Sequence, residues 1–362
     1  MLVSVLIVSL IAAVLAALLV VARHFLNDYG ECRITINDSR SLSVQGGGTL
    51  LESLTSNSVF IPSACGGRGT CAYCKVKVLG GGGPVNPVEE PYLSAKDRQD
   101  GIRLSCQIKV RNDISIEIPQ SLMSIREYSC RCAGIRDLTG DIKEFRLELQ
   151  EPGSMDYVPG QYIQLFCPAY DGKEEVYRAY SIASDPGNRK SIDLVIRLVP
   201  GGICTTWCFE KLKEGDSVRM NGPYGDFRLS DSDAPMVFVA GGSGMAPMKC
   251  ILHHMKNTDN RRSVTYIFGA RHVSDMFYGD LMKDFEDSLE NFRFVPVVSE
   301  PDQDGKWKGE TGLVTDALRR NVGNGEGFEG YLCGSPGMIN ATVEVMKELG
   351  IREENIFYDK FE

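Results

Sequence analysis

The chain has 362 residues, a formal net charge of −9 and 43% hydrophobic residues. This length indicates two or three domains, and the globular composition excludes a wholly disordered or collagenous chain. The acidic balance argues against nucleic acid as a partner, because phosphate binding usually requires a basic face. The 12 cysteines are too sparse for a small secreted disulfide scaffold, so their positions are more informative than their number.

The first feature along the chain is an apolar run over residues 2–22 that contains no charge, Pro or Gly. At about 1.5 Å per residue it can cross a hydrocarbon core of about 30 Å. Arg23 follows the run and no basic side chain precedes it. The positive-inside rule therefore predicts a single-pass anchor over residues 1–23 in the inner membrane, with the N-terminus outside and the other domains in the cytoplasm. The alternative is a cleaved signal peptide ending near Ala22, although such peptides usually have a basic start and a shorter apolar run.

The rest of the chain predicts three further domains. Residues 31–122 alternate short apolar runs with Gly-rich turns, which indicates a small β-rich domain with a helix over residues 49–56. Residues 125–229 contain regular strands broken by Gly and Pro, which favour an antiparallel β-barrel with a helix over residues 205–212. Residues 233–362 alternate continuous apolar strands with helical stretches, which is typical of a parallel α/β sheet.

Four cysteines have the spacing of metal-cluster ligands, C-x5-C-x2-C-x31-C, at Cys65, Cys71, Cys74 and Cys106. Glycines between the first three let the backbone turn sharply and direct N–H groups at inorganic sulfide. The pattern is close to the plant-type ferredoxin spacing, with one extra residue in the first gap. Zinc is the alternative, but zinc motifs usually contain two matched C-x2-C pairs, and Cys106 stands alone. We therefore expect a [2Fe–2S] cluster on these four thiolates.

A second group of residues fits a dinucleotide that carries a flat redox-active ring. Arg178 can offer a bidentate fork to a diphosphate, Tyr180 can lay its ring on the flat system, and Ser181 can donate a hydrogen bond near a reactive ring nitrogen. Taken alone, a surface Arg beside a strand Tyr is the simpler interpretation. A predicted helix start with a Thr205 hydroxyl adds an anion site, because N-terminal N–H groups bind phosphate. The residues predicted here are Arg178, Ala179, Tyr180, Ser181, Gly202, Ile203, Cys204 and Thr205.

A third group fits a nicotinamide dinucleotide. A Gly-rich turn follows an apolar strand and opens a helix, which places it in the crevice at the carboxyl edge of a parallel sheet. Cys333 ends another strand and could face a nicotinamide, although a buried free cysteine is the commoner role. Asp275 could bind an adenosine ribose and so favour NADH as the cofactor. The nearby Arg271 instead favours NADPH. The turn residues predicted here are Gly241, Gly242, Gly244 and Met245.

In this order, the cysteine motif, the 178–181 segment and the 241–247 turn resemble the ferredoxin–NAD(P) reductase superfamily with an N-terminal plant-type ferredoxin domain. Over the whole chain, including the apolar run, the sequence is similar to the family of F subunits of sodium-translocating NADH:quinone reductases. The resemblance implies a β-grasp ferredoxin-like domain, an FAD-binding barrel and an NADH-binding α/β domain. It also implies that residues 178–181 bind FAD and that Phe361 lies over the flavin.

The function implied is that of a membrane-anchored enzyme that passes hydride from NADH to FAD and single electrons to the cluster. Its partners would be other membrane subunits and, through them, a quinone. Coupled sodium movement would lie in those subunits, because an uncharged helix offers no ion path. Two alternatives remain open: the reductase component of a membrane oxygenase, and a tethered electron carrier with a vestigial nucleotide domain.

Overall fold

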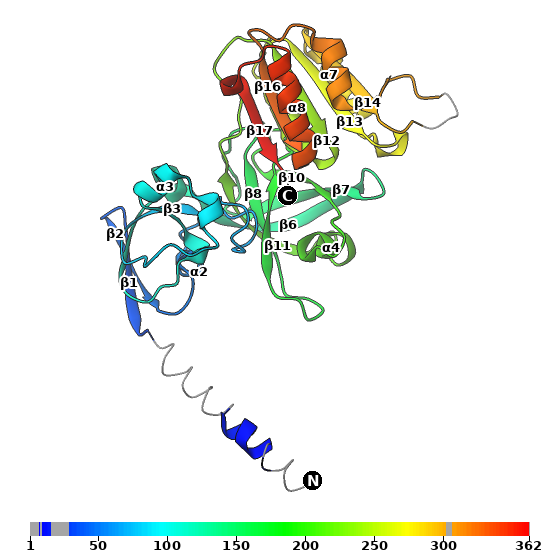
Figure 1. Ribbon diagram of the computed structural model, residues 1–362. Coiled ribbons are helices and arrows are strands. Elements are labelled where there is room, and N and C mark those ends of the chain that lie inside the picture. The colour runs from blue at the N-terminus through cyan, green and yellow to red at the C-terminus, as the bar shows by residue number, and fades with distance from the viewer. Residues whose placement is uncertain (1–6, 8, 16–28, 302–305, 362) are drawn as a thin grey trace. The chain divides into compact units, whose positions relative to one another are not determined.

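The computed structural model describes residues 7, 9–15, 29–301 and 306–361 (Figure 1). It divides into two compact units, Met1–Ile125 and Arg126–Glu362, and each is described by itself. The predicted anchor falls mostly outside the described residues, of which 9–15 are helical. None of the helices in the described ranges has the length and apolar character needed to cross a membrane.

The first unit contains a mixed sheet together with the helices α2 and α3. The strand order is β2-β1-β5-β3-β4, and β1 and β5 run parallel while the other neighbours run antiparallel. Every second residue of β1 is buried, which is the period of a strand with one face on the core. The elements are β1 (Glu31–Ile36), β2 (Arg40–Gln45), α2 (Leu50–Ser56), β3 (Lys75–Gly80), α3 (Ala95–Gln99), β4 (Ile102–Leu104) and β5 (Ile114–Glu117).

Helix α2 begins directly after Thr49, where the sequence provides a helix cap. Thr49 accepts a hydrogen bond from the Glu52 N–H, and the Glu52 carboxylate accepts one from the Thr49 N–H, which is a complete capping box. Leu50, Leu51 and Leu54 then form the buried face of α2. The predicted helix over residues 49–56 and the predicted β-rich domain are therefore confirmed.

The second unit begins with an antiparallel sheet in the order β10-β7-β6-β11-β8-β9. A bridge between Ile182 and Leu194 joins the segment after β9 to β10, so the sheet curls into the predicted barrel. The elements are β6 (Arg126–Asp137), β7 (Ile142–Glu151), β8 (Tyr162–Cys167), β9 (Val176–Ser181), β10 (Ser191–Arg197), α4 (Ile203–Glu210) and β11 (Ser217–Tyr224). The helix predicted over residues 205–212 lies two residues earlier, because the chain turns at Gly201, with φ of 74°, and helical geometry begins directly after Gly202.

The unit ends with a parallel sheet in the order β15-β14-β13-β12-β16-β17. The central strand β12 consists of consecutive apolar residues because its side chains alternate between two hydrophobic cores, one on each face of the sheet. Helices α7 and α8 pack side by side on one face (Figure 1). Helices α5 and α6 pack in the core on the opposite face. The elements are β12 (Met236–Gly241), α5 (Met245–Asn257), β13 (Val264–Ala270), α6 (Gly279–Ser288), β14 (Phe292–Val298), β15 (Glu310–Thr311), α7 (Val314–Val322), β16 (Glu329–Gly334), α8 (Pro336–Glu348) and β17 (Ile356–Lys360).

Candidate functional site

The four predicted cluster ligands lie as two thiol pairs in the first unit. The Cys71 thiol donates to Cys65 Sγ at 3.4 Å, and the Cys74 thiol donates to Cys106 Sγ at 3.3 Å. Two thiolates on one tetrahedral metal ion lie about 3.8 Å apart when each bond to sulfur is about 2.3 Å. Among the described residues, no group of three or more Cys, His, Asp or Glu side chains is arranged to hold one metal ion. The donor set therefore fits a cluster with two metal ions, each held by one pair of thiolates.

The loop between Cys65 and Cys74 depends on glycine. Gly66, Gly67 and Gly69 have φ values of 66°, 84° and 79°, in the left-handed region that other residues rarely adopt. A Cβ atom on Gly69 would lie 2.7 Å from the Gln107 side-chain nitrogen, so a larger residue there would have to displace the Gln107 side chain. The loop thus wraps closely against the turn that carries Cys106.

A buried ion pair next to the cluster loop was not predicted from the sequence. Arg103 Nε lies 2.9 Å from Glu89 Oε2, and Arg103 Nη2 lies 2.6 Å from Glu89 Oε1. Arg103 also donates to the carbonyl oxygens of Gly83 and Pro84, both at 2.9 Å. Since Arg103 lies three residues before Cys106, this pair ties the glycine-rich loop after β3 to the strand that positions a cluster ligand.

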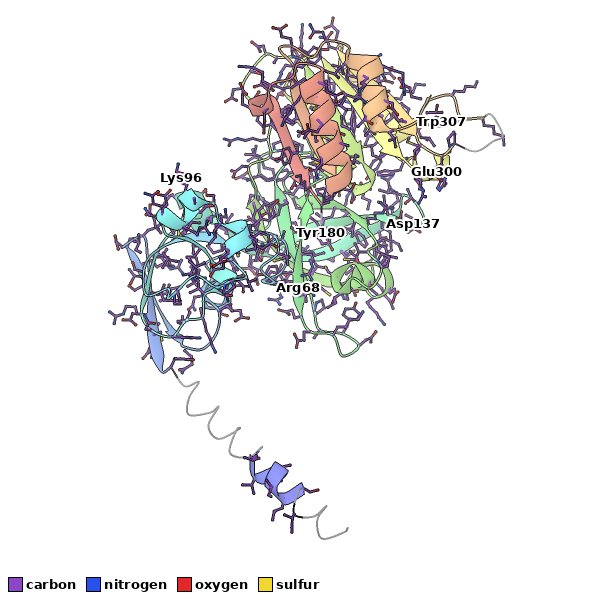
Figure 2. The ribbon with its side chains drawn as sticks, in the orientation of Figure 1. Arg68, Lys96, Asp137, Tyr180, Glu300 and Trp307 are labelled. Carbon is purple, nitrogen blue, oxygen red and sulfur yellow. The ribbon has the colours of Figure 1, made fainter. Side chains whose placement is uncertain are left out.

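The residues predicted to bind a flavin lie on β9 and at the start of α4. Tyr180 packs against the core of the barrel (Figure 2), and burial raises the pKa of its hydroxyl well above the ordinary value. Within the described residues this buried hydroxyl has no hydrogen-bond partner. Arg178 Nη1 donates to the Tyr177 carbonyl at 2.7 Å, and Ser181 is buried at the end of the strand. The unpartnered hydroxyl and the Arg178 guanidinium fit a bound polar cofactor.

The start of α4 offers backbone rather than side-chain groups. Gly202 occupies the N-cap position without a capping side chain, so the first N–H groups of the helix remain available to an anion. Thr205 Oγ1 accepts a hydrogen bond from the Val199 N–H at 3.2 Å and so stabilises the loop that precedes α4. Ile203 is half-buried and the Cys204 side chain is buried in the barrel core, so Cys204 can contribute only its N–H.

The predicted nucleotide turn follows β12, as expected. Gly242 has φ of 55°, and a Cβ atom on Gly244 would lie 2.2 Å from the Cys333 carbonyl oxygen. The Met245 side chain is buried and its sulfur accepts a hydrogen bond from the Tyr266 hydroxyl at 3.0 Å, so only its backbone faces the turn. A Cβ atom on Gly241 would lie 3.1 Å from the Met338 sulfur, so this strand end is also closely packed.

Three other predicted residues lie around this edge of the sheet. Cys333 is completely buried, and burial raises the pKa of its thiol well above the ordinary value. The Phe361 N–H donates to the Gly334 carbonyl at 2.9 Å, which brings the C-terminal aromatic residue beside the end of β16. The Asp275 carboxylate accepts from the His272 N–H at 3.0 Å and caps its own turn. The structure therefore gathers Gly244, Cys333 and Phe361, while Asp275 is engaged locally.

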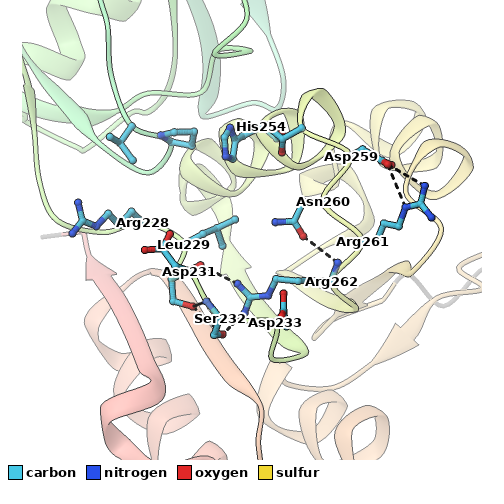
Figure 3. A pocket seen from close by; sticks show the side chains of 14 residues that line it. Arg228, Leu229, Asp231, Ser232, Asp233, His254, Asp259, Asn260, Arg261 and Arg262 are labelled. Atoms are coloured by element: carbon cyan, nitrogen blue, oxygen red, sulfur yellow. Dashed lines mark hydrogen bonds and ion pairs between the residues drawn. The ribbon is translucent and has the colours of Figure 1, made fainter.

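A separate polar pocket of about 970 Å³ lies at the opposite, amino edge of the parallel sheet (Figure 3). The buried Arg262 beside it donates to the Ala234 carbonyl at 2.8 Å and lies 2.6 Å from a Glu329 carboxylate oxygen. These contacts fasten the segment that links the barrel to the parallel sheet. None of the predicted cofactor residues lines this pocket.

Comparison with known proteins defines the class. The chain matches a 2Fe-2S iron-sulfur cluster binding domain over residues 34–111, an oxidoreductase FAD-binding domain over 129–229 and an oxidoreductase NAD-binding domain over 238–344. Together with the fold, these matches define a ferredoxin reductase-like oxidoreductase with three cofactor domains.

Curated relatives specify the family. The F subunit of the Na(+)-translocating NADH-quinone reductase of a Marinomonas species is 33% identical over 97% of this chain and 96% of its own length. The corresponding protein of Pseudomonas aeruginosa is 34% identical over 96% of this chain and 95% of its own. The chain belongs to this family, the F subunits of Na(+)-translocating NADH-quinone reductases.

Solved structures agree with the fold. An Amycolatopsis cytochrome P450 reductase, GcoB, superimposes with a TM-score of 0.74 at 30% identity and covers 91% of this chain and 98% of its own. A ferredoxin reductase in carbazole 1,9a-dioxygenase has a TM-score of 0.69 at 23% identity over 92% of this chain and 99% of its own, which shows the fold alone.

Proposed function

We propose that this chain is the subunit through which electrons enter a membrane NADH:quinone reductase. It would bind NADH at the carboxyl edge of the parallel sheet, FAD on the barrel and a [2Fe–2S] cluster on the first unit. FAD takes up a hydride and releases single electrons, so it joins the two-electron donor to the one-electron cluster. The family's domain order supports this assignment.

The observation that carries the proposal is the position of the nucleotide turn next to the barrel. A Cβ atom on Gly242 would lie 3.6 Å from Arg197 Nη1, at the end of β10, and 3.8 Å from the Ile142 side chain of β7. The turn, Cys333 and Phe361 thus meet at the edge of the sheet that faces the flavin domain. Such an arrangement would hold a nicotinamide against a flavin and exclude water from the transfer.

The residue roles remain part of the proposal. Arg178 and the N–H groups of residues 202–205 would bind the FAD diphosphate, Ala179 and Tyr180 would line the ring, and Ser181 would donate to it. Gly241, Gly242, Gly244 and the Met245 backbone would admit the NADH pyrophosphate, and Asp275 would bind the ribose. Cys333 would face the nicotinamide, and Phe361 would lie over the flavin. Cys65, Cys71, Cys74 and Cys106 would hold the cluster.

The membrane topology is likewise proposed. Residues 1–23 would anchor the chain in the inner membrane with the N-terminus outside, and domains over residues 31–122, 125–229 and 233–362 would lie in the cytoplasm. The apolar run over residues 2–22, followed by Arg23, supports this topology. The partners would be membrane subunits that carry electrons to a quinone.

A membrane oxygenase as electron acceptor is the second candidate, and the likeness to the Amycolatopsis P450 reductase supports it. The relatives at 33–34% identity over nearly their whole length favour the quinone reductase complex. A vestigial nucleotide domain is disfavoured by the NAD-binding match over residues 238–344.

The test is to purify the detergent-solubilised full chain and assay FAD, iron and acid-labile sulfide together with NADH oxidation by ferricyanide. We expect one FAD and one two-iron cluster per chain, and faster oxidation of NADH than of NADPH. A chain that lacks flavin, or that leaves ferricyanide unreduced with NADH, contradicts the proposal. Co-purification from native membranes then identifies the acceptor as reductase subunits or an oxygenase.

A further inference from the structure

Glu144 of the barrel is a nearly buried carboxylate with three charged or hydroxyl partners. Its side chain is 11% exposed. Lys249 Nζ lies 2.8 Å from Glu144 Oε1, Arg136 Nη2 lies 2.8 Å from Oε2, and the Tyr278 hydroxyl donates to Oε1. Burying a charge is costly unless such partners compensate it, so this arrangement needs an explanation.

Two of the three partners of Glu144 come from the segments proposed to bind NADH, while Arg136 lies on the barrel strand β6. Lys249 lies on α5, the helix that opens at the Gly244 turn, and its side chain is 7% exposed. Tyr278 closes the segment that carries Asp275 and begins α6. Glu144 itself lies on β7 of the flavin domain. One barrel carboxylate therefore holds both nucleotide-binding segments.

The Tyr278 backbone supports this interpretation. Its φ of 59° and ψ of 24° lie in the left-handed region, which is uncommon and unfavourable for a bulky residue. Lys249 Nζ lies 5.1 Å from the centre of its ring and Arg136 Cζ lies 5.3 Å from it. Together with the hydrogen bond to Glu144, these contacts hold a conformation that the local sequence does not favour.

A neighbouring carboxylate is already engaged elsewhere. Asp193 lies 3.7 Å from Lys249 Nζ, but it accepts from Arg146 Nε at 2.9 Å and from Arg146 Nη2 at 3.2 Å. A pocket of about 500 Å³ beside the cluster of charges around Glu144 is lined by polar and apolar side chains, including Glu214, His253 and Leu281. Apolar packing also joins α5 to the barrel, since Cys250 lies in the barrel core, and the polar contacts of Glu144 add directional links to it at this point.

We propose that Glu144 is a positioning residue for hydride transfer, which sets the place of the NADH-binding segments relative to the flavin through Lys249 and Tyr278. This inference rests on the proposed function. Displacing a bound reactant by about 1 Å can cost about a hundredfold in rate, so loosening these contacts should slow flavin reduction.

The test uses the full chain with its cofactors and the variants Glu144→Gln, Lys249→Met and Tyr278→Phe. The matched control is Glu148→Gln, further along the same strand, where Glu148 pairs with Arg131 at 2.6 Å and both side chains are about half exposed. Flavin reduction by NADH is followed by stopped flow. Amide hydrogen exchange is measured over residues 241–249 and 271–278, and bound FAD is quantified.

We expect Glu144→Gln to slow flavin reduction at least about tenfold with FAD content unchanged, and to speed exchange in both segments. Lys249→Met should speed exchange mainly over residues 241–249, and Tyr278→Phe mainly over 271–278. Glu148→Gln should match the wild type in all three measurements.

A purely structural role predicts a different outcome. In Glu144→Gln, the buried Lys249 loses its carboxylate partner. If the role is purely structural, the double variant Glu144→Gln/Lys249→Met, which also removes this cation, would regain both wild-type stability and wild-type rate. We expect it to regain stability but to remain slow. Wild-type rate and exchange in Tyr278→Phe and Glu144→Gln would overturn the inference, whereas an unmodified chain that NADH does not reduce would overturn the proposed function itself.

Discussion

Gly244 and Cys333 approach so closely that no side chain fits between them: a Cβ atom on Gly244 would lie 2.2 Å from the Cys333 carbonyl oxygen. The contact joins the turn after β12 to the end of β16, neighbouring parallel strands. It is the point where the nucleotide turn is fixed to the sheet.

Replacing Gly244 with Ala should therefore push the turn away from β16. Overpacking of this kind typically costs about 1–3 kcal/mol. We expect weaker NAD⁺ binding, by about tenfold or more, with FAD content unchanged, measured by calorimetric titration. Gly337→Ala is the control, because Gly337 lies exposed in α8 with open space around its Cβ position. Equal losses in the two variants would contradict this account of Gly244.

Cys71→Ala should remove the cluster without removing hydride transfer to flavin, because Cys71 lies in the first unit and the flavin site in the second. We expect the paramagnetic signal of the reduced cluster to disappear while flavin bleaching by NADH persists. Cys32→Ala, a buried cysteine of the same unit remote from the motif in sequence, should retain the signal. Loss of flavin bleaching in Cys71→Ala would contradict the assignment of the cluster to the first unit and of the flavin site to the second.

Glu89→Gln should destabilise the first unit. Glu89 is completely buried and its two oxygens lie 2.6 and 2.9 Å from Arg103 nitrogens, so the variant leaves an uncompensated buried cation. Breaking a buried pair in this way costs about 3–5 kcal/mol. Urea unfolding followed by the cluster absorbance should show the loss, whereas Glu117→Gln, at an exposed pair with Lys77, should unfold like the wild type.

The same pair predicts a pH dependence. Burial tends to raise the pKa of Glu89, but hydrogen bonds from Arg103 and from the Asn86 and Leu104 N–H groups outweigh it, and the pKa lies below the ordinary value of 4.5. A lowered folded-state pKa stabilises the fold above the ordinary value, and this stabilisation is lost as pH falls through the folded-state pKa. The stability gap between wild type and Glu89→Gln should thus be full at pH 7 and shrink below about pH 4. A gap that stays constant down to about pH 3 would argue against a charged Glu89.

Arg178→Ala should weaken FAD binding. Hydrogen bonds to charged groups contribute about 1.5–3 kcal/mol, which corresponds to a roughly tenfold to hundredfold loss of affinity. Retention of flavin through gel filtration measures the effect. The control is Arg189→Ala, which alters an exposed pair with Asp156 and should retain FAD. Equal retention of FAD by the two variants would contradict a role of Arg178 in FAD binding.

Local patterns account for what could be predicted from the sequence. The cysteine spacing predicted ligands that the structure brings together in pairs, because most of that loop is contiguous in the chain. The apolar run of β12 predicted a strand buried on both faces. Strands β15 and β17 were not predicted, since β15 has only two residues and β17 is mostly half-exposed at the sheet edge.

Contacts between distant residues could not be predicted. Glu144 and Lys249 are 105 positions apart in the sequence. Glu and Lys are residue types that usually lie on a protein surface, so neither position alone indicates a buried ion pair. Cys204 and Met245 were expected near cofactors, but both side chains turn into the core because the first turn of each helix packs against the sheet. Only their backbone N–H groups remain for a ligand.

Electron transfer from NADH through the flavin to the cluster can be followed in an anaerobic titration of the cofactor-loaded full chain with NADH. Flavin absorbance and the cluster's paramagnetic signal are recorded on the same samples. We expect NADH to bleach the flavin and then to produce the signal of a reduced [2Fe–2S] cluster in the wild type, and to cause only bleaching in Cys71→Ala. A cluster that stays oxidised in the wild type while the flavin is fully reduced, or a flavin that NADH does not reduce, would contradict this sequence of electron transfer.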